Sequence, residues 1–417
     1  MGRMPTTSDS RRVVVTGVGA VCGFGWGVEP LETGLRAGAT ALLPFSRFDH
    51  SRHRTHLAAQ VPEPPSGVAA SFPAWRRLTQ ADRFALFAAA EAVSQAGLAA
   101  PLGPAAGVFF GSSTGGMFET ELFYRELARK GGRPRLSALA SQPVSGPGDA
   151  VGRHLQVAGP VRTISSACSS ATLALGAALD AIRAGEVEVA IAGGSDSLCQ
   201  LTYAGFNSLR AVAEGPCRPF REGRDGMSIG EGAAVFVLEP LALALQRGAL
   251  PLAELAGAGS CCDAHHMTAP DPAGEGAAAA VEAALADAGV AAGRVDFVNA
   301  HGTGTPLNDA AEWRALERVF GPRGRLLPLT ATKGAVGHLL GSAGAIEALA
   351  TLLCLRAGEV HPTPGDGPVD PALPLALVTG RPLPLRAEVA VSVNLAFGGS
   401  NAALVLSRFP APADRAA

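Results

Sequence analysis

The chain has 417 residues, of which 47% are hydrophobic and 17% charged, which suits a globular protein with a large core and two or three domain-sized units. Its formal net charge is −2, and the absence of a basic tail or a long block of like charges argues against nucleic acid as a partner. We find no signal-peptide pattern and no 18-residue apolar span, and we therefore expect a cytoplasmic protein without a membrane segment.

The first predicted element is a buried strand over residues 11–21, which leads into a glycine turn. A Gly-x-Gly after a strand can mark a dinucleotide fold, but the third glycine and the later acidic residue are missing here. A helix is expected over residues 73–98, and residues 107–116 predict a second strand followed by a glycine-rich turn. The basic stretch 125–135 is typical of a solvated face, with contact to an acidic partner as the alternative.

Residues 161–164 predict a short strand, and an Ala/Leu-rich helix without proline follows and ends at Gly185. Between them, the small residues of Ser166-Ala-Cys-Ser-Ser place Cys168 at a helix N-terminus. There the free backbone N–H groups and the helix dipole favour a thiolate. On this stretch alone, a buried structural cysteine is an equal alternative. The seven cysteines are scattered, and we expect neither a disulfide framework nor a metal site.

The chain contains an internal repeat. The first half continues with a strand predicted over residues 187–196 and a glycine-rich loop from Arg224 that leads into another strand. A new Ala-rich helix is expected over residues 276–288, and a strand from residue 295 delivers His301 into a turn. Arg183-Ala-Gly-Glu-Val recurs as Arg356-Ala-Gly-Glu-Val, each at the end of an Ala/Leu-rich helix. We therefore expect two similar α/β halves, residues 1–250 and 251–417.

Four motifs in this order resemble the β-ketoacyl-ACP synthases, the condensing enzymes of fatty-acid and polyketide synthesis, and especially discrete enzymes of the ketoacyl-ACP synthase II type. They are Ser166-Ala-Cys-Ser-Ser, His301-Gly-Thr-Gly-Thr-Pro-Leu-Asn-Asp, Lys333-Gly-Ala-Val-Gly-His-Leu-Leu-Gly-Ser-Ala-Gly and Asn394-Leu-Ala-Phe-Gly-Gly-Ser-Asn. The resemblance covers nearly the whole chain. It implies a thiolase-like α/β fold, a duplicated five-layered αβαβα arrangement. It also implies a dimer, no bound cofactor, and substrates carried on the phosphopantetheine of an acyl carrier protein.

By this resemblance Cys168 accepts the acyl chain as a thioester, and His301 and His338 assist the decarboxylation of malonyl carrier protein. A thiolate suits this role because it is both a good nucleophile and a good leaving group. Two imidazole N–H donors can stabilise the enolate that decarboxylation creates. Lys333 matches the family's site lysine, with Glu347 as its partner, and it is one of only two lysines in the chain.

The resemblance also assigns the surroundings of the reacting atoms. The backbone N–H groups of Cys168 and Phe397 would form an oxyanion hole, with Phe397 also acting as a gate. Four further residues are expected to contact the substrate: the hydroxyls of Thr303 and Thr305 hold the phosphopantetheine arm, Phe206 lies in the substrate site, and Thr114 lines the acyl tunnel. Ala140 is a looser match at the tunnel. Thr114 and Ala140 are smaller than the residues usual there, which predicts a wider or more polar tunnel.

The carrier protein is small and acidic in this family, so six basic residues become candidates for docking it: Arg76, Arg77, Arg129, Lys130, Arg133 and Arg135. Two alternative functions are a chain-length-determining partner subunit without catalysis and an acyltransferase that loads Cys168 but does not condense. The presence of Cys168 counts against the first, and the two histidines count against the second. The sequence leaves open a fatty-acid, polyketide or aryl polyene pathway, and a homodimer or a heterodimer with a ketosynthase-like paralogue.

Overall fold

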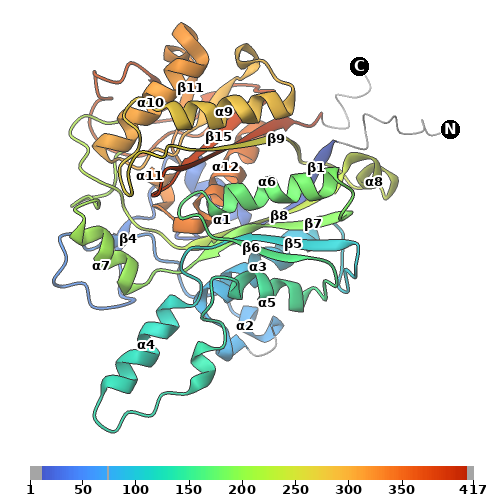
Figure 1. Cartoon of the computed structure of the whole chain (residues 1–417), viewed down its shortest axis with the longest axis vertical. Helices are drawn as coiled ribbons and strands as arrows, with labels where there is room; N and C mark the ends of the chain where they lie inside the picture. Colours follow the sequence, from blue (N-terminus) through green and yellow to red (C-terminus); the bar gives the residue numbers. More distant parts are fainter. Residues whose placement is uncertain (1–11, 73–74, 411–417) are drawn as a thin grey trace.

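The computed structural model describes residues 12–72 and 75–410, which form five layers (Figure 1). Two helices, α6 (Ser170–Arg183) and α12 (Ala343–Ala357), lie between two layers of strands. One outer face is covered by α3 (Gln80–Gln95) and α5 (Gly146–His154). The other is covered by α9 (Glu275–Ala288) and α10 (Pro306–Phe320). The expected αβαβα order is therefore confirmed.

The two strand layers have the same internal order, which supports the predicted duplication. In the first half the order is β1 (Val13–Cys22), β8 (Gly232–Pro240), β7 (Val189–Asp196), β5 (Ala106–Gly111) and β6 (Val161–Ile164). The first two pairings are antiparallel and the last two parallel. Because each of these sheets is covered by helices on both faces, strands such as β1 and β5 are buried along their whole length.

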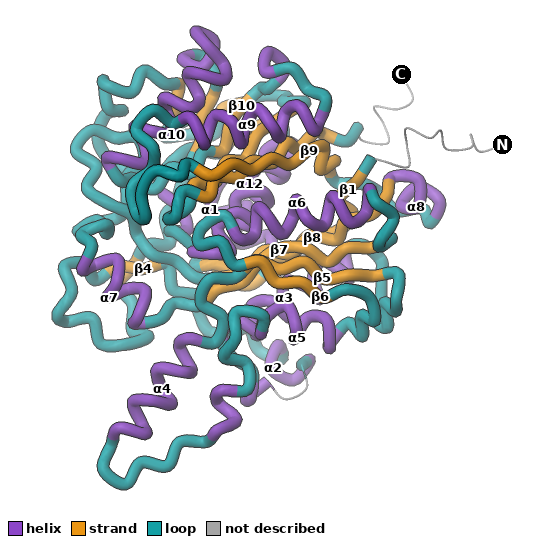
Figure 2. The backbone as a smooth tube through the Cα atoms, in the orientation of Figure 1, coloured by secondary structure: helices purple, strands orange, loops and turns teal. Residues whose placement is uncertain are grey.

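The second half repeats this order of pairings with β9 (Ala253–Cys262), β16 (Ser400–Arg408), β15 (Val389–Leu395), β10 (Phe297–Asn299) and β11 (Pro328–Thr330). Again two antiparallel pairings precede two parallel ones, and β13 (Ala376–Leu377) extends the edge. A short antiparallel pairing of β1 with β9 joins the layers into one hydrogen-bonded path (Figure 2).

The remaining described helices and strands are short and lie around these layers: α1 (Val28–Arg36), α2 (Val68–Ser71), α4 (Met117–Ala128), α7 (Gln200–Ser208), α8 (Leu241–Gln246), α11 (Lys333–Val336), β2 (Gly25–Trp26), β3 (Leu43–Pro44), β4 (Leu57–Ala58), β12 (Glu359–Val360) and β14 (Leu383–Pro384). Helix α4 and the chain that follows it project from the body as an arm (Figure 1).

The Gly-x-Gly of the first strand has a packing role. A Cβ added at Gly17 would lie 2.0 Å from the carbonyl oxygen of Ala92, and one at Gly19 would lie 2.0 Å from that of Ala88. Only glycine therefore lets α3 lie directly on β1. This contact accounts for the motif without any dinucleotide.

Two expectations about helices are wrong in part. The helix predicted from Pro73, which lies outside the described residues, begins at Gln80, because Thr79 and Asp82 form a reciprocal capping box. The expected absence of an apolar span is also wrong. Residues 340–357 are long and apolar enough to cross a membrane by length and composition, but 89% of this window is buried inside the protein. It is the central helix of the second half.

Candidate active site

Cys168 lies in the turn between β6 and α6, two residues before the helix begins at Ser170. The preceding Ala167 has φ +45°, a left-handed conformation that side chains rarely adopt. Its carbonyl oxygen accepts hydrogen bonds from the hydroxyls of Ser113 (3.0 Å) and Ser170 (2.6 Å), which hold this turn in place. Backbone strain that is held by such contacts is a feature of functional sites. The predicted placement at a helix N-terminus is confirmed.

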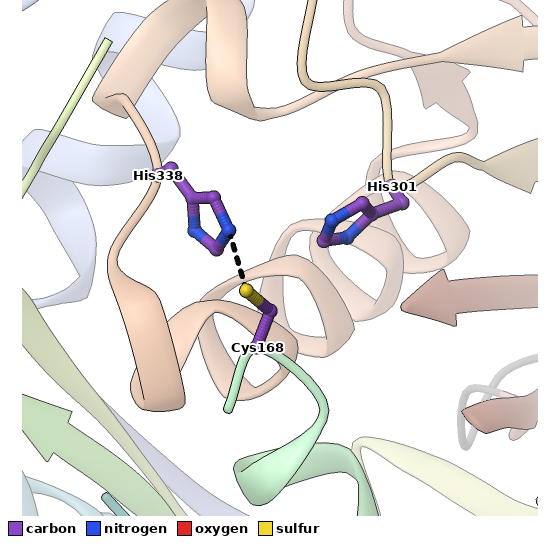
Figure 3. Close-up of side chains that lie close together, drawn as sticks. All are labelled: Cys168, His301 and His338. Carbon is purple, nitrogen blue, oxygen red and sulfur yellow. Dashed lines mark hydrogen bonds between the residues drawn. The ribbon is translucent and has the colours of Figure 1, made fainter. Parts of the chain in front are cut away.

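Three side chains meet around the sulfur (Figure 3). His338 Nε2 lies 3.0 Å from Cys168 Sγ. The rings of His301 and His338 are nearly perpendicular, with centroids 5.4 Å apart. One sulfur or nitrogen atom from each of the three residues lies within 4.8 Å of the others. The first half of the chain thus supplies the thiol, and the second half supplies both imidazoles.

Hydrogen bonds to the far side of each ring determine its tautomer. The backbone N–H of Leu340 donates to His338 Nδ1 at 3.1 Å, and Lys333 Nζ donates to His301 Nδ1 at 3.0 Å. Because both donors can only donate, both Nδ1 atoms accept, and each Nε2 of a neutral ring carries the proton. Burial, together with the charge of Lys333, lowers the pKa of both histidines well below the ordinary value. Both rings are therefore neutral N–H donors.

A buried polar chain holds Lys333 in place. Lys333 Nζ also donates to the carbonyl oxygen of His301 (2.7 Å) and pairs with Glu347 Oε1, and Lys333 and Glu347 are each 1% exposed. Asn394 Nδ2 donates to Glu347 Oε2 at 2.5 Å, while its Oδ1 accepts from the hydroxyl of Thr172 at 2.6 Å. Asn394 begins one of the four motifs, but the motif alone assigned it no role.

Glu312 is a second buried residue that the motifs did not reveal. Its carboxyl oxygens accept from the backbone N–H groups of His301 (2.6 Å) and Gly302 (2.9 Å). Complete burial raises the pKa of this carboxyl to about 8. Glu312 lies on α10, eleven positions after His301, and holds the turn that presents the imidazole.

The expectation that the helix N-terminus lowers the pKa of Cys168 is wrong, because burial has the larger effect on this thiol. Burial raises the pKa of this thiol to about 11, although Lys333 and the backbone N–H of Phe397 both act to lower it. Desolvation penalises the thiolate more than the dipole and the nearby charge favour it. The structure therefore holds a neutral thiol that is 7% exposed.

A cavity of about 300 Å³ opens onto the sulfur. Of the predicted residues, it is lined by Cys168, His301, His338, Thr303, Thr305, Phe206 and Phe397. The hydroxyls of Thr303 and Thr305 are 2.9 Å apart, and the rings of Phe206 and Phe397 have centroids 5.6 Å apart. Arg210 and Asp225 also line the cavity and were not predicted.

The two predicted tunnel residues do not line this cavity. Thr114 is buried, and both its backbone N–H and its hydroxyl donate to Asp196 Oδ1 at 2.8 Å. Ala140 is exposed where the arm returns to the body, directly after the 3₁₀ turn Leu136–Leu139. Their small size therefore does not widen the cavity described here. Outside these assigned residues, His266 Nδ1 accepts from the backbone N–H groups of Thr268 and Ala269.

The six candidate docking residues are all exposed: Arg76, Arg77, Arg129, Lys130, Arg133 and Arg135. Four of them belong to the arm or the loop that follows α4, and Arg129 pairs with Glu126 at 3.1 Å. Arg76 and Arg77 lie in a short 3₁₀ turn before α3. These basic residues thus lie on the surface, which fits both a solvated face and contact with an acidic partner.

A cysteine and two neutral imidazole donors in one cavity of a duplicated thiolase-like fold define a ketosynthase, a condensing enzyme of the acyltransferase class. The chain belongs to the β-ketoacyl synthase family: the family's N-terminal domain matches residues 10–244 and its C-terminal domain matches residues 252–365.

Related proteins agree with this assignment. The 3-oxoacyl-[acyl-carrier-protein] synthase 2 of Staphylococcus aureus (strain COL) is 36% identical over 415 residues, covering 97% of this chain and all of that protein. The structure of the ishigamide ketosynthase/chain length factor is similar with a TM-score of 0.90 at 33% identity, covering 96% of this chain and all of that one. A type II polyketide ketosynthase, solved with its acyl-carrier protein and bound to the hexaketide, has a TM-score of 0.88 at 28% identity, with the same coverage.

Proposed function

We propose that the chain elongates an acyl group held on Cys168, using malonyl carrier protein as the two-carbon donor and releasing carbon dioxide. The observation that carries this proposal is the convergence of Cys168 Sγ with the Nε2 atom of His338 at 3.0 Å, beside His301, in a single cavity. Related structures contain an acyl-carrier protein or a chain length factor beside the ketosynthase, which supports a carrier-bound substrate here.

In the first half-reaction, the sulfur of Cys168 attacks the thioester carbonyl of the incoming acyl group. The proton that the Cys168 thiol loses ends on the departing phosphopantetheine thiolate, so this half-reaction neither gains nor loses a proton. The backbone N–H groups of Cys168 and Phe397 would hold the oxyanion, since the N–H of Phe397 already points to the sulfur. His338 acts here as a donor to the thiolate and not as its base, because its Nε2 carries a proton.

In the second half-reaction, malonyl carrier protein loses carbon dioxide, and the electron pair of the broken carbon–carbon bond forms an enolate. The Nε2 protons of His301 and His338 stabilise the enolate oxygen. The enolate carbon then attacks the acyl thioester on Cys168, and the sulfur leaves as a thiolate. Lys333 holds His301 in the required tautomer, and Glu347 and Asn394 hold Lys333.

The rest of the cavity would position the substrate. We assign the paired hydroxyls of Thr303 and Thr305 to the phosphopantetheine arm, and the contacting rings of Phe206 and Phe397 to the gate of the acyl site. Thr114 and Ala140 keep their tunnel role only as a hypothesis, since neither lines the cavity in this single chain. No separate cofactor is needed for these steps.

We further propose that the protein is a dimer and that its halves divide near residue 250. Strand β6 is the outermost strand of the first half and pairs only with β5 among the described strands. The side chains of Val161 and Arg162 on it are exposed. A second copy or a ketosynthase-like paralogue could pair with this edge. Because Cys168 and both histidines are present, this chain would be the catalytic member of either dimer.

One experiment tests the reaction and separates it from the alternatives. The purified protein is mixed with an acyl carrier protein bearing an acyl chain, and Cys168 is examined by mass spectrometry. Malonyl carrier protein is then added and carbon dioxide is measured. We expect acyl-Cys168 first, then carbon dioxide and a chain longer by two carbons. Acylation without carbon dioxide would indicate an acyltransferase, and no acylation would indicate a partner subunit.

A further inference from the structure

The three reacting side chains are also a set of metal ligands. A cysteine thiolate and an imidazole nitrogen are both ligands that zinc accepts, and water can complete a tetrahedral set around three protein ligands. Here one ligand atom from each of Cys168, His301 and His338 lies within 4.8 Å of the others, and all three residues are buried (Figure 3). An imidazole can bind a metal only through a nitrogen that has a free lone pair. The tautomers therefore decide whether this set can bind zinc.

The backbone fixes the tautomer of His338. Leu340 N–H donates to His338 Nδ1 at 3.1 Å, so the proton of the neutral ring is on Nε2. That nitrogen faces Cys168 Sγ at 3.0 Å. Leu340 itself has φ +53°, a conformation that costs energy for a residue with a side chain and that is found most often at functional sites.

Lys333 fixes the tautomer of His301. An ammonium group has three N–H bonds and no lone pair. Lys333 Nζ has three acceptors: His301 Nδ1 at 3.0 Å, the carbonyl oxygen of His301 at 2.7 Å, and Glu347 Oε1. All three N–H bonds are thereby used. The amide of Asn394 lies 3.4 Å from the same Nδ1 atom and is a second donor on that side.

We propose that Lys333 and the backbone of Leu340 protect the site from zinc by holding both imidazoles with Nε2–H directed at the cavity. For Nε2 to bind a metal ion, the proton would have to move to Nδ1, where a donor already stands. An Nε2–H group instead presents a positive end to any cation. In metal sites, the imidazole nitrogen that does not bind the metal normally carries the proton and donates it to a carboxylate or carbonyl oxygen. Here a donor stands in that position for both rings.

The test compares wild type with Lys333→Met, which removes the 3.0 Å donor to His301 Nδ1, keeps an unbranched side chain, and leaves the longer 3.4 Å contact of the Asn394 amide in place. Lys130→Met is the matched control, because Lys130 is the chain's other lysine and is exposed. Each protein is incubated with zinc chloride alone, treated with iodoacetamide, and digested to measure alkylation of Cys168. This readout needs no carrier protein, so failure of the proposed condensation would not affect it.

We expect zinc to protect Cys168 in Lys333→Met at concentrations at least ~10-fold lower than in wild type or Lys130→Met, since outer hydrogen bonds change metal affinity by about 10- to 100-fold. Mapping at Cys168 is necessary because total zinc binding would include surface histidines. His50 Nδ1 and His56 Nδ1 lie 3.0 Å apart on the surface, and such a pair could bind zinc by itself.

A second variant guards against misfolding. Lys333→Met leaves the buried carboxyl of Glu347 without its cation, which destabilises the folded state. The double variant Lys333→Met, Glu347→Leu replaces both members of the ion pair by apolar side chains, and such a replacement usually costs much less stability. Circular dichroism identifies the variants that fold. Equal protection of Cys168 in wild type and in a folded variant, or no protection in either folded variant, would overturn the proposal.

Discussion

Replacing each histidine by alanine should separate the two half-reactions. Loss of one oxyanion donor typically costs about 2.7–4 kcal/mol, so decarboxylation should fall by about 100- to 1000-fold in both His301→Ala and His338→Ala. Acylation should differ between them. Of the two imidazoles, that of His338 is the one that bonds to Cys168 Sγ, and a hydrogen bond to a charged group is worth about 1.5–3 kcal/mol. His338→Ala should therefore acylate about 10- to 100-fold more slowly, and His301→Ala at the wild-type rate.

Acylation is followed by mass spectrometry of Cys168 after rapid quenching, and decarboxylation by carbon dioxide release from malonyl carrier protein. His53→Ala is a matched control, because His53 does not line the cavity and packs on Tyr203, with ring centroids 5.5 Å apart. If His301→Ala slowed acylation as strongly as His338→Ala, the roles derived from the Nε2–Sγ contact would be refuted. Wild-type carbon dioxide release in either variant would refute the donor role.

Three further outcomes are expected. Because burial raises the pKa of Cys168 to about 11, its rate of alkylation by iodoacetamide should rise about tenfold per pH unit between pH 7 and 10; a plateau near pH 8 would show that the thiolate is already formed. Because burial raises the pKa of Glu312 to about 8, from an ordinary value of 4.5, the folded state retains a proton that the unfolded state releases. The free energy of unfolding should therefore fall as the pH rises from about 4.5 to 8, and Glu312→Gln should fall less steeply in urea titrations over this range. Phe206→Ala removes the ring that contacts Phe397 and enlarges the cavity. It should raise the kcat/KM for bulky relative to linear acyl chains, with each additional buried CH₂ worth about 0.8 kcal/mol, and unchanged ratios would place the acyl chain elsewhere.

The sequence predicted the repeat, the strand–turn–helix around Cys168 and the motifs that meet at the cavity. These features are local, since they depend on hydrophobic periodicity, small residues and short spacings. Glu312 and Asn394 received no role because their function depends on contacts with His301 and Glu347 that only the folded chain creates. The same holds for the tautomer of His338, which a backbone N–H determines.

Two wrong expectations have one physical cause. The pKa of Cys168 follows from how completely the surrounding layers exclude water, and a helix N-terminus in the sequence says nothing about that. The apolar span at residues 340–357 has a composition that would also fit a membrane segment, and only the packing of the layers shows that protein surrounds it. Burial is a property of the whole fold, so a local pattern could not predict it.

The contact between the two central helices has a mechanical consequence for the chemistry. A Cβ added at Gly344 would lie 2.0 Å from the hydroxyl of Thr172, so the helices touch where neither has room to spare. At this point Thr172, from the half that carries the nucleophile, bonds to Asn394, from the half that carries the two imidazole donors. Asn394 also bonds to Glu347, and Glu347 pairs with Lys333. A shift of one half against the other would therefore displace Asn394, and with it Glu347 and Lys333. The distance between the two central helices therefore determines how well Lys333 and the imidazole that it orients are aligned with Cys168. Any change that loosens the packing of the two duplicated halves should also disturb the catalytic geometry.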